Sequence, residues 1–180
     1  MVVKSSEHWQ RANAEELLAA YASGERNFAG AHLRRLKLFN AYLRGINLSD
    51  ADLQEAYLRQ AILESADLTR ASLKQASLIG ANLCGVNAFQ INMESADCRN
   101  ARLEEGVFSQ GNLSNANFDH ANLARASFTG ANLSGADFVG ANLLDANFTG
   151  ANLTGAKITE EQLRQSICHN TRLPGGITTL

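Results

Sequence analysis

Large apolar side chains recur at every fifth position of this chain, from Phe28 to Ile158, without a break in register. These 27 positions, called centres below, hold 17 Leu and 6 Phe, together with Ala88, Met93, Cys98 and Ile158. Two residues before each centre, 20 of 27 positions are Ala, and one residue before it, 16 of 27 are Asn or Asp. The other two positions are mostly polar residues or Gly. Each repeat therefore has one large apolar, one small apolar and three polar positions.

A period of five fits neither an ordinary helix nor an ordinary strand. On an α-helix, successive centres would be rotated by about 140° and would not share a face. On one continuous strand, residues five apart point to opposite sides of the sheet. The pattern therefore predicts a chain that turns once in every repeat, and the Gly, Ser, Asn and Asp residues at the polar positions suit such turns.

The stretch ANLSGADFVGANLLDANFTGANLTGAK, within residues 131–157, is almost undiluted repeat. It resembles the pentapeptide-repeat family, whose motif is A(N/D)LXX, and the resemblance covers about 135 of the 180 residues. It implies a small protein of bacterial or cyanobacterial type. The implied fold is an all-β solenoid, a right-handed quadrilateral β-helix with four repeats per coil and about seven coils. The centre and the Ala two residues before it would point inward, where large and small side chains interdigitate.

Four repeats per coil place residues twenty apart in one column, and the columns predict two kinds of core. The N-terminal half is nearly all Leu, whereas five Phe centres mark the C-terminal half. Between them several positions depart from the rule: Val86, Ala88, Ile91, Met93, Cys98, Gly106, Val107 and Gly111. Two interpretations remain open. One is compensated packing within a continuous rod, and the other is a junction between two arrays with a local bend.

Short capping helices are predicted at both ends, because solenoid ends expose core. Asn13 followed by Glu16 is an N-cap signal for a helix of about residues 14–23, and Thr159 with Gln162 is a capping box for a second helix to about Ser166. A loose tail is expected around Pro174, Gly175 and Gly176. The expected organisation is an N-terminal segment with a capping helix (1–25), the β-helix (26–160), and a C-terminal helix and tail (161–180).

The sequence carries little that points to catalysis, so we expect no catalytic, cofactor-binding or metal-binding residues. The four His residues share no metal-ligand spacing, no Ser or Thr has an identifiable base, and no phosphate-binding loop is present. A small hydrolase is kept only as a formal alternative. The three Cys residues form no CxxC pair, and the first residues form neither a signal peptide nor a membrane anchor, which favours a cytoplasmic protein.

Apolar side chains also stand at predicted outward positions of the early coils. We name them the N-terminal patch: Phe39, Tyr42, Tyr57, Ile62 and Ile79. Tyr42 and Ile62 are one coil apart on the same side. An exposed apolar patch of this kind is typical of an interface, so we expect a protein partner or self-association as a dimer. The alternative is that the N-terminal segment, including Trp9, folds back over the patch.

Charge limits the choice of partner. The net charge is −2 and the pI about 6.1, which does not favour direct binding of nucleic acid. Some members of the family resemble B-DNA in width and negative charge and bind type II topoisomerases such as DNA gyrase as DNA mimics. That mechanism needs an acidic surface, but residues 26–160 hold 12 Lys or Arg and 13 Asp or Glu. The leading hypothesis is therefore a non-enzymatic binding or scaffold rod that acts through its outer faces, with gyrase modulation as the alternative.

Overall fold

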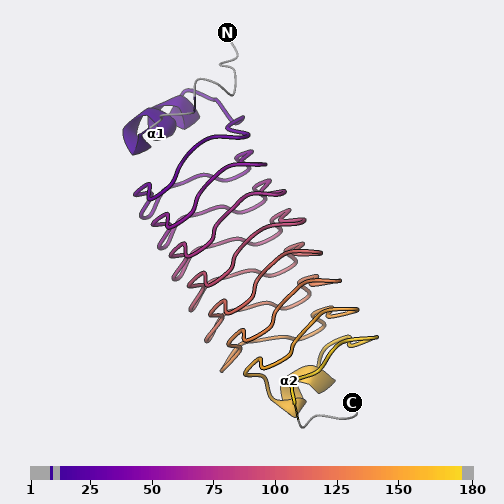
Figure 1. Ribbon diagram of the computed structural model, residues 1–180. Coiled ribbons are helices and arrows are strands. Elements are labelled where there is room, and N and C mark those ends of the chain that lie inside the picture. The colour runs from indigo at the N-terminus through magenta and orange to yellow at the C-terminus, as the bar shows by residue number, and fades with distance from the viewer. Residues whose placement is uncertain (1–8, 10–12, 176–180) are drawn as a thin grey trace.

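The computed structural model describes Trp9 and residues 13–175. The array is a rod of stacked coils with helix α1 (Ala14–Ala22) at one end and α2 (Glu160–Arg164) at the other (Figure 1). Parallel β-bridges join residues twenty apart, from Asn27 with Asn47 to Asn152 with Arg172. Among the described residues these are isolated bridges rather than longer strands, because the chain turns after every repeat. The chain is therefore a β-helical solenoid.

The turns share one backbone feature. In every repeat from Phe28 to Leu153, the second residue after the centre has a positive φ, such as 58° at Gln75 and 65° at Gly80. The amide that follows bonds back to the centre, as Ala31 N–H does to Phe28 O at 3.1 Å. Positive φ at this position is typical of a type II turn, which Gly adopts without steric penalty. A non-glycine residue there is disfavoured by about 1–2 kcal/mol.

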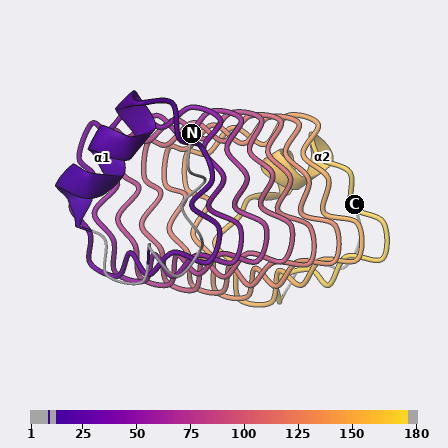
Figure 2. The same cartoon turned by 90° about the horizontal axis from the view of Figure 1, so that it is seen from above.

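Backbone hydrogen bonds connect each coil to the coil before it and the coil after it. Leu83 N–H donates to Arg102 O at 2.7 Å, and the neighbouring Asn82 N–H donates to Ala61 O at 2.9 Å. The same two bonds recur along the array, so each repeat contacts only its neighbours, as in other solenoids. Seen from above, the coils follow one another in register behind α1 (Figure 2).

The interior is apolar along its whole length. All centres from Phe28 to Leu153 are buried, and no polar or charged side chain in the described part of the chain is fully buried. In the C-terminal half the Phe rings stack in columns, with centroids 5.3 Å apart in the pairs Phe108–Phe128, Phe118–Phe138 and Phe128–Phe148. Stacked aromatic pairs add to the stabilisation from burial alone.

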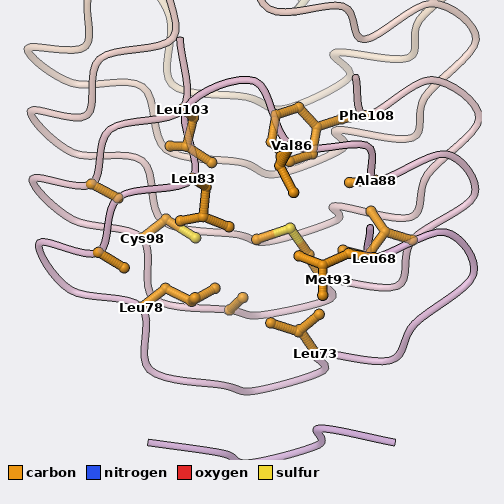
Figure 3. Packing of buried hydrophobic residues seen from close by; sticks show 14 of the residues in the cluster. Leu68, Leu73, Leu78, Leu83, Val86, Ala88, Met93, Cys98, Leu103 and Phe108 are labelled. Atoms are coloured by element: carbon orange, nitrogen blue, oxygen red, sulfur yellow. The ribbon is translucent and has the colours of Figure 1, made fainter. Parts of the chain in front are cut away.

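One coil, residues 86–105, joins the two kinds of core (Figure 3). In the two columns that receive Phe, this coil has small centres, Ala88 and Cys98, directly before Phe108 and Phe118. In each of these two columns, a centre with a reduced side-chain volume therefore lies one coil before the larger Phe ring. The bridges run through this coil without interruption, including Asn87 with Val107.

The inward position two residues before each centre shows the opposite order of side-chain sizes, with larger residues first and glycines one coil later. Val86 and Ile91 replace Ala and are fully buried, while Gly106 and Gly111 follow them one coil later. A Cβ atom at Gly106 would lie 2.5 Å from the Phe108 ring, and one at Gly111 would lie 3.1 Å from Ile91. The two glycines therefore accommodate the larger neighbours, which favours compensated packing over a junction between arrays.

The N-terminal end of the core is covered by apolar side chains. Asn13 and Glu16 form the capping box that starts α1, and the helix buries Leu17 and Tyr21. The Trp9 ring packs against the ring of Phe28, with centroids 4.5 Å apart. Because these residues are buried on the first coil, water is kept from that end of the core.

The C-terminal end differs from the expected tail. Thr159 and Gln162 form the capping box of α2, but the five-residue spacing continues through the helix in Leu163, Cys168 and Leu173. Ile167 and Arg172 resume the bridges to Asn147 and Asn152, and Pro174 is buried. The loose tail expected around Pro174 is therefore wrong up to that residue, whereas Gly176 lies outside the described residues. The sequence signal for a helix at these residues obscured the fact that the five-residue register continues through them.

Candidate binding surface

The N-terminal patch has three exposed aromatic side chains. Phe39, Tyr42 and Tyr57 are 47%, 56% and 42% exposed, whereas Ile62 and Ile79 are half-buried. The structure brings the rings of Phe39 and Tyr57 to a centroid distance of 5.7 Å. It also pairs Tyr42 with Ile62 through a β-bridge. These four residues form neighbouring parts of one surface over the first two coils.

Ile79 lies further along the rod. It follows Phe39 by two coils in the same column, with the exposed Arg59 between them: Asn40 N–H bonds to Arg59 O, and Gln60 N–H to Ile79 O. The sequence did not single out Tyr21 of α1, whose ring meets Tyr42 edge-on at 6.5 Å. Its hydroxyl donates to Arg44 O at 2.7 Å, which fixes α1 beside the patch.

Trp9 does not cover this surface. Its ring lies on the core at Phe28, and its carbonyl accepts a hydrogen bond from His32 N–H at 3.1 Å. The rest of the segment before Asn13 lies outside the described residues. With Trp9 and α1 in place, about half of the surface of the three aromatic side chains of the patch stays accessible to solvent.

Most charges on the rod are arranged in short-range pairs. Arg44 meets Glu64 one coil away at 3.0 Å, as the column rule predicts, and Arg70 makes a two-pronged contact with Asp50 at 2.7 Å. The hydrogen bonds from Arg70 hold the pKa of the Asp50 carboxyl below its usual range. Such exposed pairs stabilise the fold only slightly, and they leave no acidic stripe along these columns.

A polar hollow of the surface surrounds Cys84. It is lined by Glu64, Ser65, Cys84, Gly85, Arg102, Glu104 and Glu105. The Cys84 thiol donates to a Glu104 carboxylate oxygen at 2.9 Å. Burial, together with this hydrogen bond and the negative charge of Glu104, raises the pKa of Cys84 to about 11. The thiol is therefore protonated at neutral pH and is a poor nucleophile.

No group of metal ligands gathers among the residues that the structure describes. His120 contacts Asp119 at 2.7 Å on the exposed surface, but neither faces a nucleophile in a pocket. The sequence named Val107 only as a departure from the repeat, and it passed over three other outward apolar residues that the structure exposes: Val139, Leu144 and Ile167. Scanning every outward position for apolar side chains would have found them. None of the helices in the described part of the chain is long and apolar enough to span a bilayer.

The sequence profile of pentapeptide repeats matches this chain in eight copies, over residues 26–54, 51–87, 96–135 and 126–165. The chain belongs to the pentapeptide-repeat family. The gap between the second and third matched ranges, residues 88–95, falls in the coil that joins the two cores. The last range extends into α2, in agreement with the register found there. A comparison with curated protein sequences gives no significant match.

The chain is similar to several solved structures of pentapeptide repeat proteins. HetL from the cyanobacterium Nostoc sp. strain PCC 7120, a protein involved in regulating heterocyst differentiation, is 25% identical with a TM-score of 0.50. The alignment covers 94% of this chain and 100% of HetL. The plasmid-mediated fluoroquinolone resistance protein QnrB1 is 22% identical, with a TM-score of 0.41 and coverage of 87% and 95%. Another pentapeptide repeat protein from Nostoc PCC 7120 is 23% identical, with a TM-score of 0.39 and coverage of 94% and 91%.

Proposed function

We propose that this protein is a non-enzymatic binding rod that engages a protein partner through the N-terminal patch. The rod would be a right-handed quadrilateral β-helix of about seven coils, closed by α1 and α2, and acting in the cytoplasm. The exposure of three aromatic side chains on two neighbouring coils is the observation that supports this proposal most directly. Large exposed aromatics rarely cluster on a soluble surface without a binding role.

The inert chemistry of the surface supports a binding role over catalysis. The polar hollow at Cys84 holds a thiol whose pKa is raised to about 11, with carboxylates that are already paired to arginines. The likeness to HetL extends over the full length of that protein. It favours a regulatory role for this rod, exerted by binding another protein.

A matched pair of variants tests the proposal. Tyr42→Ser with Ile62→Ser removes apolar surface and leaves every centre of the repeat in place, and Val107→Ser is the control at the same position of another repeat, 39% exposed. Affinity capture from the native cells with mass spectrometry should lose its specific partner in the double variant and keep it in the control. Unchanged capture by a folded double variant would overturn the proposal.

Gyrase modulation by DNA mimicry remains the alternative, and the surface gives it less support. Arginine and carboxylate side chains alternate along the columns and neutralise each other, as in Arg35 with Glu55 at 2.7 Å. A DNA mimic instead needs unpaired negative charge in place of phosphates. A supercoiling assay with purified DNA gyrase should show no inhibition at micromolar protein, and dose-dependent inhibition would restore this alternative.

A further inference from the structure

The first coil has an open backbone edge beside the N-terminal patch. In the later coils up to Lys157, the amide one residue before the centre donates to the preceding coil, as Tyr57 N–H does to Leu36 O at 2.9 Å and Ile62 N–H does to Ala41 O at 2.8 Å. The equivalent amides of Lys37 and Tyr42 have no acceptor among the described residues. Unpaired edge groups of this kind are a template for an added strand.

Other parts of the first coil are already closed. Asn27 N–H bonds to a carboxylate oxygen of Glu25 at 2.8 Å, and His32 N–H bonds to Trp9 O at 3.1 Å. α1 lies along one side of this coil (Figure 2), and its Tyr21 hydroxyl donates a hydrogen bond to the carbonyl oxygen of Arg44. Arg44 belongs to the repeat of Tyr42, whose ring also contacts Tyr21, so α1 occupies that side. The open edge is therefore confined to the repeat of Lys37 and Phe39.

Two cations at the patch lack an ion-pair partner. Lys37 precedes Tyr57 in one column, and Arg59 follows Phe39 in the next. No carboxylate of the described residues lies within 4.0 Å of either cation, although Arg59 also acts at longer range on Asp97. Glu55, the acid nearest to Arg59 in sequence, is already paired with Arg35 at 2.7 Å. The patch is thus positive while the whole chain has a net charge of −2.

We propose that the open edge at Lys37 takes an extended protein segment that alternates acidic and apolar side chains. This inference rests on the proposed function and names the chemistry of its partner. The free Lys37 amide offers a hydrogen bond to the backbone of the segment, as in β-strand addition. Lys37 and Arg59 pair with its carboxylates, and the rings of Phe39 and Tyr57 contact its apolar side chains.

A second copy of this chain fits the edge less well. Because the open edge is short, a two-fold pairing of two copies brings Lys37 close to its counterpart, and like charges placed opposite each other destabilise a strand pair. Nucleic acid also fits less well, since it offers no backbone partner that continues a β-ladder and the chain as a whole repels it. An acidic segment satisfies both the Lys37 amide and the two cations.

Binding of a defined probe tests the charge requirement. A fluorescein-labelled octapeptide, Glu-Val-Glu-Phe-Glu-Val-Glu-Phe, is titrated with the full chain, and its analogue with Lys in place of Glu is the matched control. We expect saturable binding of the acidic peptide only. Lys37→Glu with Arg59→Glu should weaken it about tenfold or more, whereas Arg125→Glu, on the opposite half of the rod, should leave it unchanged.

The backbone contact is tested separately. Lys37→Ala removes the charge, and Lys37→Pro removes the charge and the amide hydrogen, so the second variant should bind about fivefold more weakly than the first. Hydrogen exchange provides a measurement on the unaltered chain. The Lys37 amide should exchange quickly in the free protein and become protected when the acidic peptide binds.

Each contrary result has a distinct meaning. No binding of the acidic peptide, or equal binding of the Lys analogue, overturns the inference; the proposed function then stands if Tyr42→Ser with Ile62→Ser still loses the captured partner. Competition by a twelve-nucleotide oligothymidine would assign the patch to nucleic acid. Dimerisation lost in Lys37→Glu would assign it to a second copy. Protection of the Lys37 amide in the free monomer would show that the chain itself covers the edge. Each of these three results overturns the inference.

Discussion

The first three coils (residues 26–85) and the last coils (residues 106–158) follow one five-residue rule with different side chains. The first part packs Leu in nearly every column, whereas the second stacks Phe in two of the four columns, with ring centroids 5.3 Å apart. Their turns differ too. Residues 50–75 place six non-glycine residues at positive φ, but between residues 130 and 155 Gly takes five of the six such positions. The apolar surface also differs, since the aromatic patch lies only on the first part.

This difference shows that the register and the choice of side chains are separate properties of the rod. Each coil contacts only its neighbours, so a change in core needs only one intermediate coil that matches both sides. Residues 86–105 are that coil, with Ala88 and Cys98 before the first rings and Gly106 after Val86. The outward positions are under no such constraint, which leaves them free to carry a binding surface.

The largest expected effect comes from deleting one large side chain in each part of a single column. Leu68→Ala should cost about 2–5 kcal/mol, and Phe128→Ala, which interrupts the stack of Phe108 and Phe148, about 3–5 kcal/mol. Urea unfolding followed by circular dichroism measures both. Phe128→Leu is the control and should be milder than Phe128→Ala because it turns the site into a Leu centre. A Leu68→Ala loss that exceeds the Phe128→Ala loss would contradict the extra stability assigned to the stack.

A smaller effect is expected at the intermediate coil. Gly106→Ala places a methyl group against the Phe108 ring and should destabilise the rod by about 1–3 kcal/mol. Adding Phe108→Leu should recover part of this loss, because the ring is the nearest obstacle. Thermal unfolding of the single and double variants measures the stability lost in each. Purely additive losses of stability would mean that the two positions do not compensate each other.

The turns should respond in opposite directions. Gln75→Gly relieves a positive φ of 58° and should stabilise the rod by about 0.5–1 kcal/mol after the entropy of Gly is included. Gly80→Ala, the matched reverse change one repeat later, should cost about 1 kcal/mol because its φ is 65°. Both are measured by urea unfolding. Changes of the same sign in the two variants would mean that turn strain does not decide stability here.

The smallest effect concerns acid. Hydrogen bonds from Arg70 and Arg35 hold the pKa values of Asp50 and Glu55 below their ordinary values. Since the folded pKa is the lower one, this stabilisation is present above the unfolded pKa of about 4 and is lost as the pH falls through the folded value. Thermal unfolding between pH 7 and pH 3 should therefore show a slight drop only at the acid end. Arg70→Ala should reduce that drop, and an unchanged profile in this variant would rule out the pair as its source.

The sequence predicts the interior of this protein well and its surface only in part. The spacing of five places Leu83 and Ala81 inside and Asn82 outside, because only one orientation of the repeat buries every large side chain. The register through α2 was missed, since a capping box and a centre such as Leu163 occupy the same few residues. Outward orientation of Tyr42 followed from the rule, but the half-buried state of Ile62 depends on flanking side chains that no period describes. The open amide of Lys37 depends on where α1 lies, which the repeat does not determine.

The central claim is that the first coils bind and the last coils do not, and one column allows a direct test. Phe39 and Val139 stand five coils apart in the same column and are 47% and 51% exposed. Binding of the captured protein partner to Phe39→Ser and Val139→Ser can be compared by calorimetry at matched concentration. We predict an affinity loss of about tenfold or more for Phe39→Ser and no change for Val139→Ser. Equal losses, or a loss confined to Val139→Ser, would contradict the account.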